Sequence, residues 1–357
     1  GRNNGIGIAG VAGGSGQAGS GVRLMSMQII GGVSQEAGYE ANSFVFAANN
    51  GACISQNSWS YSVPDFFPQF TADAIDYFIE NAGGGQLGGG LVVFSAGNYG
   101  TSQLYYPAPY SRVLAVAATG PADEKGPYSS FGPWVDICAP GGNNQQPAGQ
   151  DATIYSTITG SSYGYLQGTS MAAPQVSGVA ALLASHLPGR LLADDVRDVL
   201  QRTAQPIEIF NSPSLAGQLG SGRLQAASAL QWAAAYKALP IVAAPAQVSL
   251  TPLCDSVRVS WALPPGGQQV VVATSLQPTV GFPEGSVWAV GQSLPGGGQI
   301  VYRGTGSQHT LALPIDGSTL YLRVWMADAS GTHYSKGISL QYEVPNTIQN
   351  LQYQGGQ

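Results

Sequence analysis

The spacing of apolar residues changes at residues 239–246, and this change constrains the fold more than any other feature of the sequence. Before it, short apolar runs typical of strands alternate with longer segments of helical periodicity, such as 71–81. After it, apolar and polar residues alternate with period two, as in 256–261, between turns rich in Gly and Pro. The sequence therefore predicts an α/β domain over 1–238, a linker over 239–246, an all-β domain over 247–345 and a tail over 346–357.

Within the first domain the order of segments is typical of a parallel sheet covered by helices. Strands are predicted over Val22 to Ile30, Cys53 to Asn57, Leu91 to Ala96 and Val113 to Ala118. Helices are predicted over Tyr39 to Asn49, Thr71 to Asn81, Met171 to Ser185, Leu192 to Arg202 and Gly222 to Ala238. The alternating pattern of the second domain predicts a small β-sandwich.

Charge and composition exclude several classes of protein. Only 9% of residues are charged, and the 13 Lys and Arg residues are scattered singly, so no basic surface is available to neutralise nucleic acid phosphates. No apolar run approaches the ~18 residues that would suggest a membrane span. Cys53, Cys138 and Cys254 are too widely separated for a metal cluster or a disulfide framework, and we interpret them as small buried hydrophobic residues.

Two segments carry groups suited to chemistry. In Gly168 to Pro174 a serine, Ser170, stands in the first turn of a predicted helix, where unpaired backbone N–H groups stabilise negative charge. By spacing alone, a residue that merely caps the helix is the better interpretation of this segment. Asn98 follows a buried strand, at the end of the sheet where α/β proteins usually bind ligands. Its amide is a candidate donor to an oxyanion, and the alternative is a simple turn residue.

Together with two further segments, these residues resemble the subtilisin-like serine peptidases. The matching motifs are Gly-Thr-Ser-Met-Ala-Ala-Pro at 168–174, Ser-Ala-Gly-Asn at 95–98, Tyr-Pro-Ala at 106–108 with Val-Leu-Ala-Val-Ala-Ala at 113–118, and Tyr-Ser-Ser-Phe-Gly-Pro at 128–133 with Asp-Ile-Cys-Ala-Pro-Gly at 136–141. The resemblance covers about residues 5–230. It implies a three-layer α/β/α fold and an endopeptidase, extracellular or at the cell surface, that hydrolyses polypeptides through an acyl-enzyme without a cofactor in the chemistry.

The resemblance also implies roles for single residues. Ser170 is expected to be the nucleophile, and Asn98 and the backbone N–H of Ser170 are expected to bind the oxyanion. The segment Ser58, Trp59 and Ser60 is expected to pair with the substrate backbone as an added strand. The primary specificity pocket is expected to have Ser95, Ala96 and Gly97 as a wall and Tyr105 at its base. Because the family often has Gly at the position of Tyr105, we expect a shallow pocket.

The histidine and aspartate that complete such a site precede the serine in this family. The only histidines here are His186, His309 and His333. His186 lies sixteen residues beyond Ser170, about 24 Å along one helix, and the other two belong to the all-β domain. Residues 3–12 resemble the stretch that follows the family's histidine, so we expect both missing groups to precede residue 1.

The strand that carries the missing aspartate is expected between those at 22–30 and 53–57. We therefore expect the chain alone to be inactive and not natively folded, with its own N-terminal segment as a partner. Either the sequence is partial or a nick has separated a piece that stays bound. The alternative is a non-catalytic binding or adhesion protein on a pseudopeptidase scaffold.

Two further features follow from resemblance alone. In some relatives the loop matched by residues 2–8 holds a structural calcium ion on backbone carbonyls and an amide, here Asn4. Residues 247–344 resemble a fibronectin type III domain, which implies a spacer or adhesion module but no particular ligand. The aromatic side chains of Trp261, Tyr321 and Trp325 are expected in its core because alternate strand positions face inward.

Overall fold

The computed structural model describes residues 7–17, 19–29, 38–239, 241–253, 255–263, 268–278, 280–314 and 317–345. The chain divides into two compact units, Gly1–Lys237 and Ala238–Gln357. None of the helices in this described part has both the length and the apolar character needed to cross a membrane. Cys138 is buried and Cys53 is half-buried, both as free thiols, whereas Cys254 lies outside the described residues.

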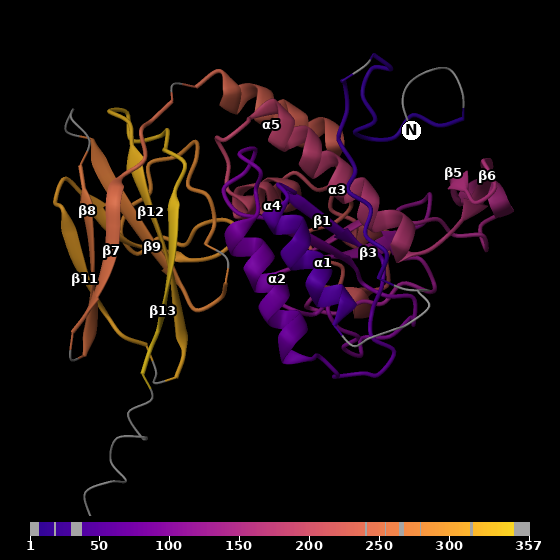
Figure 1. Cartoon of the computed structure of the whole chain (residues 1–357), viewed down its shortest axis with the longest axis horizontal. Helices are drawn as coiled ribbons and strands as arrows, with labels where there is room; N and C mark the ends of the chain where they lie inside the picture. The colour runs from indigo at the N-terminus through magenta and orange to yellow at the C-terminus, as the bar shows by residue number, and fades with distance from the viewer. Residues whose placement is uncertain are drawn as a thin grey trace, which may run out of the picture. The chain divides into compact units, whose positions relative to one another are not determined.

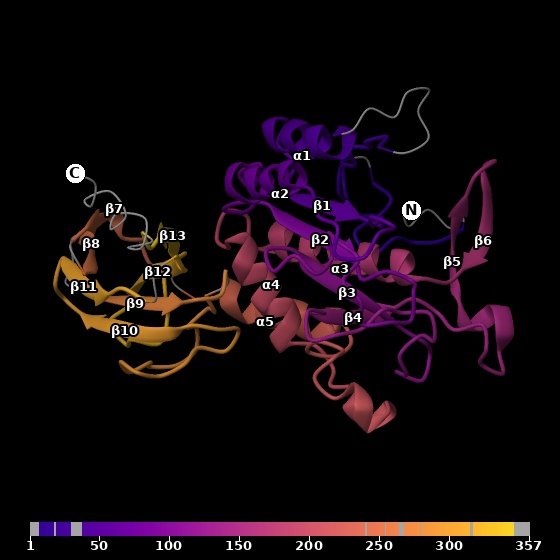
Figure 2. The ribbon, with the colours of Figure 1, turned by 90° about the horizontal axis from the view of Figure 1, so that it is seen from below.

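The first unit is built on a parallel sheet with strand order β1 (Ile54–Asn57), β2 (Leu91–Ser95), β3 (Leu114–Thr119) and β4 (Ile137–Pro140). Figure 2 shows these strands side by side in that order. Every side chain of β2 and β3 is buried. Continuous apolar runs suit these strands because a central parallel strand is covered on both faces.

Helices cover both faces of this sheet. α1 (Tyr39–Asn49) and α2 (Gln69–Asn81) pack against each other and share a core with alternate residues of β2, among them Phe94. α3 (Thr169–His186) contacts all four strands, and α4 (Ala193–Arg202) and α5 (Ala226–Lys237) pack on α3. Because successive side chains of a strand point to opposite faces, the sheet lies between two helical layers.

A two-stranded antiparallel ribbon, β5 (Ile154–Ile158) and β6 (Ser162–Leu166), leads into α3. Figures 1 and 2 both show it projecting beyond the parallel sheet and the helices that cover it. Three short 3₁₀ turns complete the unit: η1 (Gly149–Ala152), η2 (Glu208–Phe210) and η3 (Pro213–Leu215).

The prediction of a strand at 22–30 is wrong for residues 22–29, which are the part of it that the structure describes. Residues 22–29 form no strand, and the side chains of Leu24 and Met25 are 88% and 42% exposed. Their apolar alternation favours a strand, but a strand needs a neighbour for its backbone groups. Among the described residues, β1 pairs only with β2, so the outer edge of the sheet at β1 has no strand beside it.

The second unit consists of two antiparallel sheets. One has the order β11 (Gln308–Ala312), β8 (Ser256–Ala262), β7 (Ala246–Pro252), and the other has the order β10 (Gln299–Gly304), β9 (Gln269–Ser275), β12 (Thr319–Ala327), β13 (Ile338–Glu343). Residues of β8 and β11 share one core with residues of β9 and β12, as the period-two pattern predicts. Trp261 and Trp325 are buried, and Tyr321 is half-buried.

Candidate active site

The ends of three elements meet where the sequence predicted a site. β2 stops at Ser95 and is followed by Gly97 and Asn98, and α3 begins at Thr169 with Ser170 in its first turn. Gly97 has a φ of 99°, a left-handed conformation that favours glycine, and this turns the chain toward Asn98. Ser58, just beyond the end of β1, donates from its Oγ to the carbonyl oxygen of Ser170 at 3.1 Å. The structure thus brings Ser58, Asn98 and Ser170 together.

The amide of Asn98 is held in one orientation by Thr169. The Oδ1 atom of Asn98 accepts hydrogen bonds from the backbone N–H and the hydroxyl of Thr169, both at 2.9 Å. The N–H of Gly97 donates to the same hydroxyl at 3.2 Å, and Thr169 is fully buried. With Oδ1 occupied in this way, Nδ2 is the donor left to face the exposed side of Asn98. A fixed donor beside a serine hydroxyl is what stabilisation of an oxyanion requires.

The segment 58–60 presents an open backbone edge. Among the described residues, no backbone–backbone hydrogen bond uses its amides or carbonyls, whereas the next amide, that of Tyr61, donates to the carbonyl of Tyr106 at 2.8 Å. An open edge beside a nucleophile can accept an extended peptide by β-strand addition. This geometry suits the substrate-pairing role predicted for Ser58, Trp59 and Ser60.

The residues predicted to form the specificity pocket lie beside more aromatic surface than the sequence indicated. Ser95, Ala96 and Gly97 are all buried, and Tyr105 is half-buried. The ring of Tyr105 stacks on that of Tyr99, with centroids 3.8 Å apart and an angle of 15°. Tyr99 in turn lies 3.4 Å from the position that a Cβ atom would take at Gly97. The two rings therefore occupy space next to the buried wall 95–97.

No imidazole of the first unit lies near Ser170. His186 is the last residue of α3, at the opposite end from the serine, and it is the only histidine in the first unit. His309 lies on β11, and His333 follows β12 in the second unit. An imidazole that could accept the proton of Ser170 is therefore missing from the described residues of this unit.

Comparison with known proteins identifies the family. The profile of the Subtilase family of peptidases matches residues 2–227, which is more than half of the chain. The chain belongs to the subtilase family. Among its relatives, thermitase of Thermoactinomyces vulgaris is 38% identical over 167 residues, which are 47% of this chain and 52% of thermitase. A thermophilic serine proteinase of a Bacillus species is 35% identical over 167 residues, 47% of this chain and 36% of the relative.

Other matches extend over more of this subtilase. A calcium-dependent protease of a Nostoc species is 31% identical over 281 residues, covering 67% of this chain and 41% of the relative. A solved structure described as proteases from Pseudoalteromonas arctica aligns with a TM-score of 0.52 and 28% identity, covering 65% of this chain and 67% of that one. The matched regions thus span about half or less of the length of these curated relatives.

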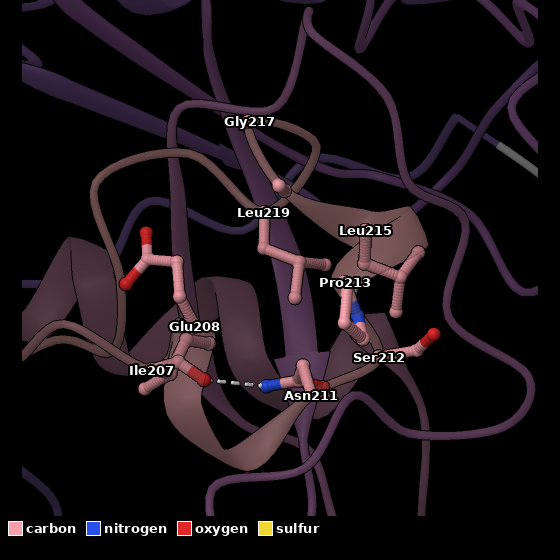
Figure 3. Close-up of a pocket in the computed structure, with 9 residues that line it drawn as sticks. Ile207, Glu208, Asn211, Ser212, Pro213, Leu215, Gly217 and Leu219 are labelled. Carbon is pink, nitrogen blue, oxygen red and sulfur yellow. Dashed lines mark hydrogen bonds between the residues drawn. The ribbon is translucent and has the colours of Figure 1, made fainter.

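A separate hollow in this subtilase lies between η2 and η3, and Figure 3 shows its lining. It has a volume of about 50 Å³ and is lined by residues of 207–219, including Ile207, Leu215 and Leu219. Asn211 lines one edge of it and donates from Nδ2 to the carbonyl of Ile207 at 2.8 Å. Ligand pockets usually measure about 300–1,000 Å³. The volume of this hollow is far below that range, and its lining contains none of the predicted site residues.

The described residues of this subtilase contain no group of three or more His, Cys, Asp or Glu side chains placed to hold a metal ion. The loop for which calcium was predicted lies mostly outside the described residues, and Asn4 is among those not described. The sequence analysis also missed Thr169 and Tyr99. Thr169 precedes Ser170 within its motif and Tyr99 follows Asn98 directly, which was the available signal, but the contacts themselves depend on the fold.

Proposed function

We propose that this subtilase is a serine endopeptidase in which the Ser170 hydroxyl attacks the scissile carbonyl. The Ser170 Oγ to carbonyl bond forms, the peptide C–N bond then breaks, and water later hydrolyses the acyl-enzyme. The oxyanion accepts hydrogen bonds from Nδ2 of Asn98 and from the backbone N–H of Ser170. The double hydrogen bond from Thr169 to Asn98 is the observation that carries this proposal, because a simple turn residue needs no such fixed amide.

The reaction also needs a group that takes the proton of Ser170 and returns it to the leaving amine. We propose that a histidine and an aspartate on an N-terminal segment of the same polypeptide supply it, so that the chain as given is inactive. The outer edge of β1, without a strand beside it among the described residues, supports this idea. Val22, Leu24 and Met27 support it as well, because their exposed apolar side chains form surface that a further segment of the domain would bury.

The proposed substrate is an extended polypeptide that pairs with the open edge 58–60. The side chain of the substrate residue whose backbone carbonyl is attacked would lie next to Ser95, Ala96 and Gly97. The stacked rings of Tyr99 and Tyr105 would restrict that space, which favours small side chains. The shallow pocket predicted from Tyr105 alone is thereby narrowed further by the ring of Tyr99.

The surroundings of the enzyme are also part of the proposal. We infer an extracellular or cell-surface protein whose second unit, with sheets of three and four strands, is a fibronectin type III-like spacer or adhesion module. One relative is named a calcium-dependent protease, and a structural calcium ion at residues 2–8 remains part of the proposal. Because no donor set for it lies among the described residues, no step of the reaction is assigned to it.

An alkyl fluorophosphonate carrying biotin tests the proposal on the product of the complete gene. We expect covalent labelling that Ser170→Ala abolishes. His186→Gln should label like the wild type, since His186 lies at the far end of α3. A folded protein that takes no label would instead favour the non-catalytic binding or adhesion protein. The supporting observation for that alternative is that no imidazole lies beside Ser170 among the described residues of the first unit.

A further inference from the structure

We propose that the hydroxyl of Tyr61 is a positioning group that holds the open edge 58–60 in the conformation an extended peptide requires. This inference rests on the proposed function, since it assigns a role to a residue that does not touch the reacting atoms. Tyr61 is the first residue beyond the open edge. It joins that edge to the first turns of both helices on one face of the sheet.

The hydroxyl of Tyr61 lies between two partners from different helices. Its oxygen is 2.8 Å from Oε1 of Glu40, in the first turn of α1, and 2.7 Å from Oγ1 of Thr71, near the start of α2. A carboxylate can only accept, so the phenol gives its single proton to Glu40 and accepts from Thr71. The three groups form one directed chain, in which each hydrogen bond polarises the next.

Burial restricts these three hydrogen-bonded groups to one another as partners. Thr71 is fully buried, and Tyr61 and Glu40 are half-buried. Burial raises the pKa of Tyr61 to about 12, so the phenol keeps the proton that it donates throughout the neutral range. Without the phenol oxygen, the Thr71 hydroxyl would have lost the atom to which it donates, in a place where water cannot replace it.

The edge is fixed on both sides while its own backbone stays open. On the near side, the Trp59 ring meets the buried Phe94 ring of β2 edge-on at 5.2 Å, and its Nε1 donates to Oδ1 of Asn57 at 3.2 Å. On the far side, the Tyr61 amide donates to the carbonyl of Tyr106, and the Tyr61 ring meets that of Trp59 at 5.6 Å. Among the described residues, the Tyr61 hydroxyl alone connects this arrangement to Glu40 and Thr71 through hydrogen bonds.

A rigid edge matters because binding then orders only the peptide. If the edge were mobile, the free energy of binding would also have to offset the entropy lost when 58–60 becomes ordered. If Tyr61 supplies that order, losing its hydroxyl should weaken the use of long peptides but leave the reactivity of Ser170 intact. If Tyr61 were merely structural, its replacement would change both the use of long peptides and the reactivity of Ser170, or it would change neither. This difference makes the role testable.

The test compares two serine-directed probes on the product of the complete gene. An alkyl fluorophosphonate reports the nucleophile, and a tetra-alanine diphenyl phosphonate reports the nucleophile together with strand pairing. For Tyr61→Phe we expect the labelling rate constant of the tetrapeptide probe to fall about three- to tenfold, with that of the alkyl probe within about twofold of the wild type. Glu40→Ala should match Tyr61→Phe, and Glu40→Gln, which keeps an acceptor oxygen, should restore most of the rate.

Tyr77→Phe is the matched control. The Tyr77 hydroxyl also joins α2 to α1, donating to Oδ1 of Asn49 at 2.8 Å, but from an exposed position. Among the described residues it forms no hydrogen bond with 58–60. It should leave both rate constants unchanged. An equal fall for both probes in Tyr61→Phe, or the same selective fall in Tyr77→Phe, would overturn the inference.

Hydrogen exchange decides the matter independently of labelling. The amides of Tyr61 and Asp65 are protected by carbonyls of Tyr106 and Leu104. We expect the fragment that carries them to exchange faster in Tyr61→Phe and not in Tyr77→Phe. If neither probe labels the wild type, the proposed function fails, and unchanged exchange in Tyr61→Phe would then refute the positioning role as well.

Discussion

Replacing Thr169 by valine should lower turnover without weakening substrate binding. Valine has nearly the shape of threonine but lacks the hydroxyl, which donates to Oδ1 of Asn98 and accepts from the N–H of Gly97. One of the two hydrogen bonds that orient the amide survives, because the backbone N–H of residue 169 remains. Losing the oxyanion amide donor entirely costs a subtilisin about 10²–10³ in kcat, which sets the upper limit. We expect a fall of about tenfold in kcat, equal to about 1.4 kcal/mol.

The Michaelis constant should stay near its wild-type value, because the orientation of Asn98 matters chiefly once the carbonyl oxygen carries charge. The assay is steady-state hydrolysis of a tetra-alanine p-nitroanilide by the product of the complete gene, normalised to sites that take up a fluorophosphonate. Thr169→Ser keeps the hydroxyl and should lie within about threefold of the wild type. The reasoning is refuted if Thr169→Val keeps full turnover while Asn98→Ala loses it, or if serine is no better than valine.

Two further predictions concern the specificity pocket and a buried thiol. Tyr105→Gly removes one ring of the stacked pair and should raise kcat/KM for a phenylalanyl substrate relative to an alanyl one by about tenfold or more; an unchanged ratio would exclude Tyr105 from the pocket. Burial raises the pKa of Cys138 from 9.0 to about 12, so at pH 8 only about one thiol in 10⁴ is ionised and a disulfide reagent should reach it only after unfolding. Because the folded pKa is the higher one, the thiol's contribution to stability is present below about pH 9 and is lost as the pH rises toward 12; rapid modification of the native thiol at pH 8 would contradict the burial.

Those parts of the fold that depend on local pattern were predictable. The apolar runs at 91–96 and 113–118 became β2 and β3, because a strand buried on both faces leaves a continuous apolar signature. The segment 22–30 shows the limit of such a pattern. Alternation records which side chains are to be buried, but pairing depends on a neighbouring strand, and among the described residues none lies there.

The candidate site likewise has parts that could be predicted from the sequence and parts that could not. Ser170 and Asn98 stand in short motifs that could be recognised, and the structure brings their elements together. The contacts that orient the site join residues far apart in sequence, such as Asn98 with Thr169 and Tyr61 with Glu40. No periodicity encodes which hydroxyl will meet which carboxylate, because that outcome depends on how α1, α2 and α3 are arranged around the sheet.

The groups proposed to bind the oxyanion are the amide of Asn98 and the backbone N–H of Ser170, and neither of them titrates near neutral pH. Burial raises the pKa of Tyr61, the phenol proposed to support the edge 58–60, to about 12. The first unit's only histidine ends α3, away from the serine. If the complete protein shows a pH-rate profile with a pKa near that of an imidazole, the group responsible must therefore come from outside the described residues of this unit. The profile would then report the proposed proton acceptor, since neither the Asn98 amide nor the Tyr61 phenol changes charge in that range.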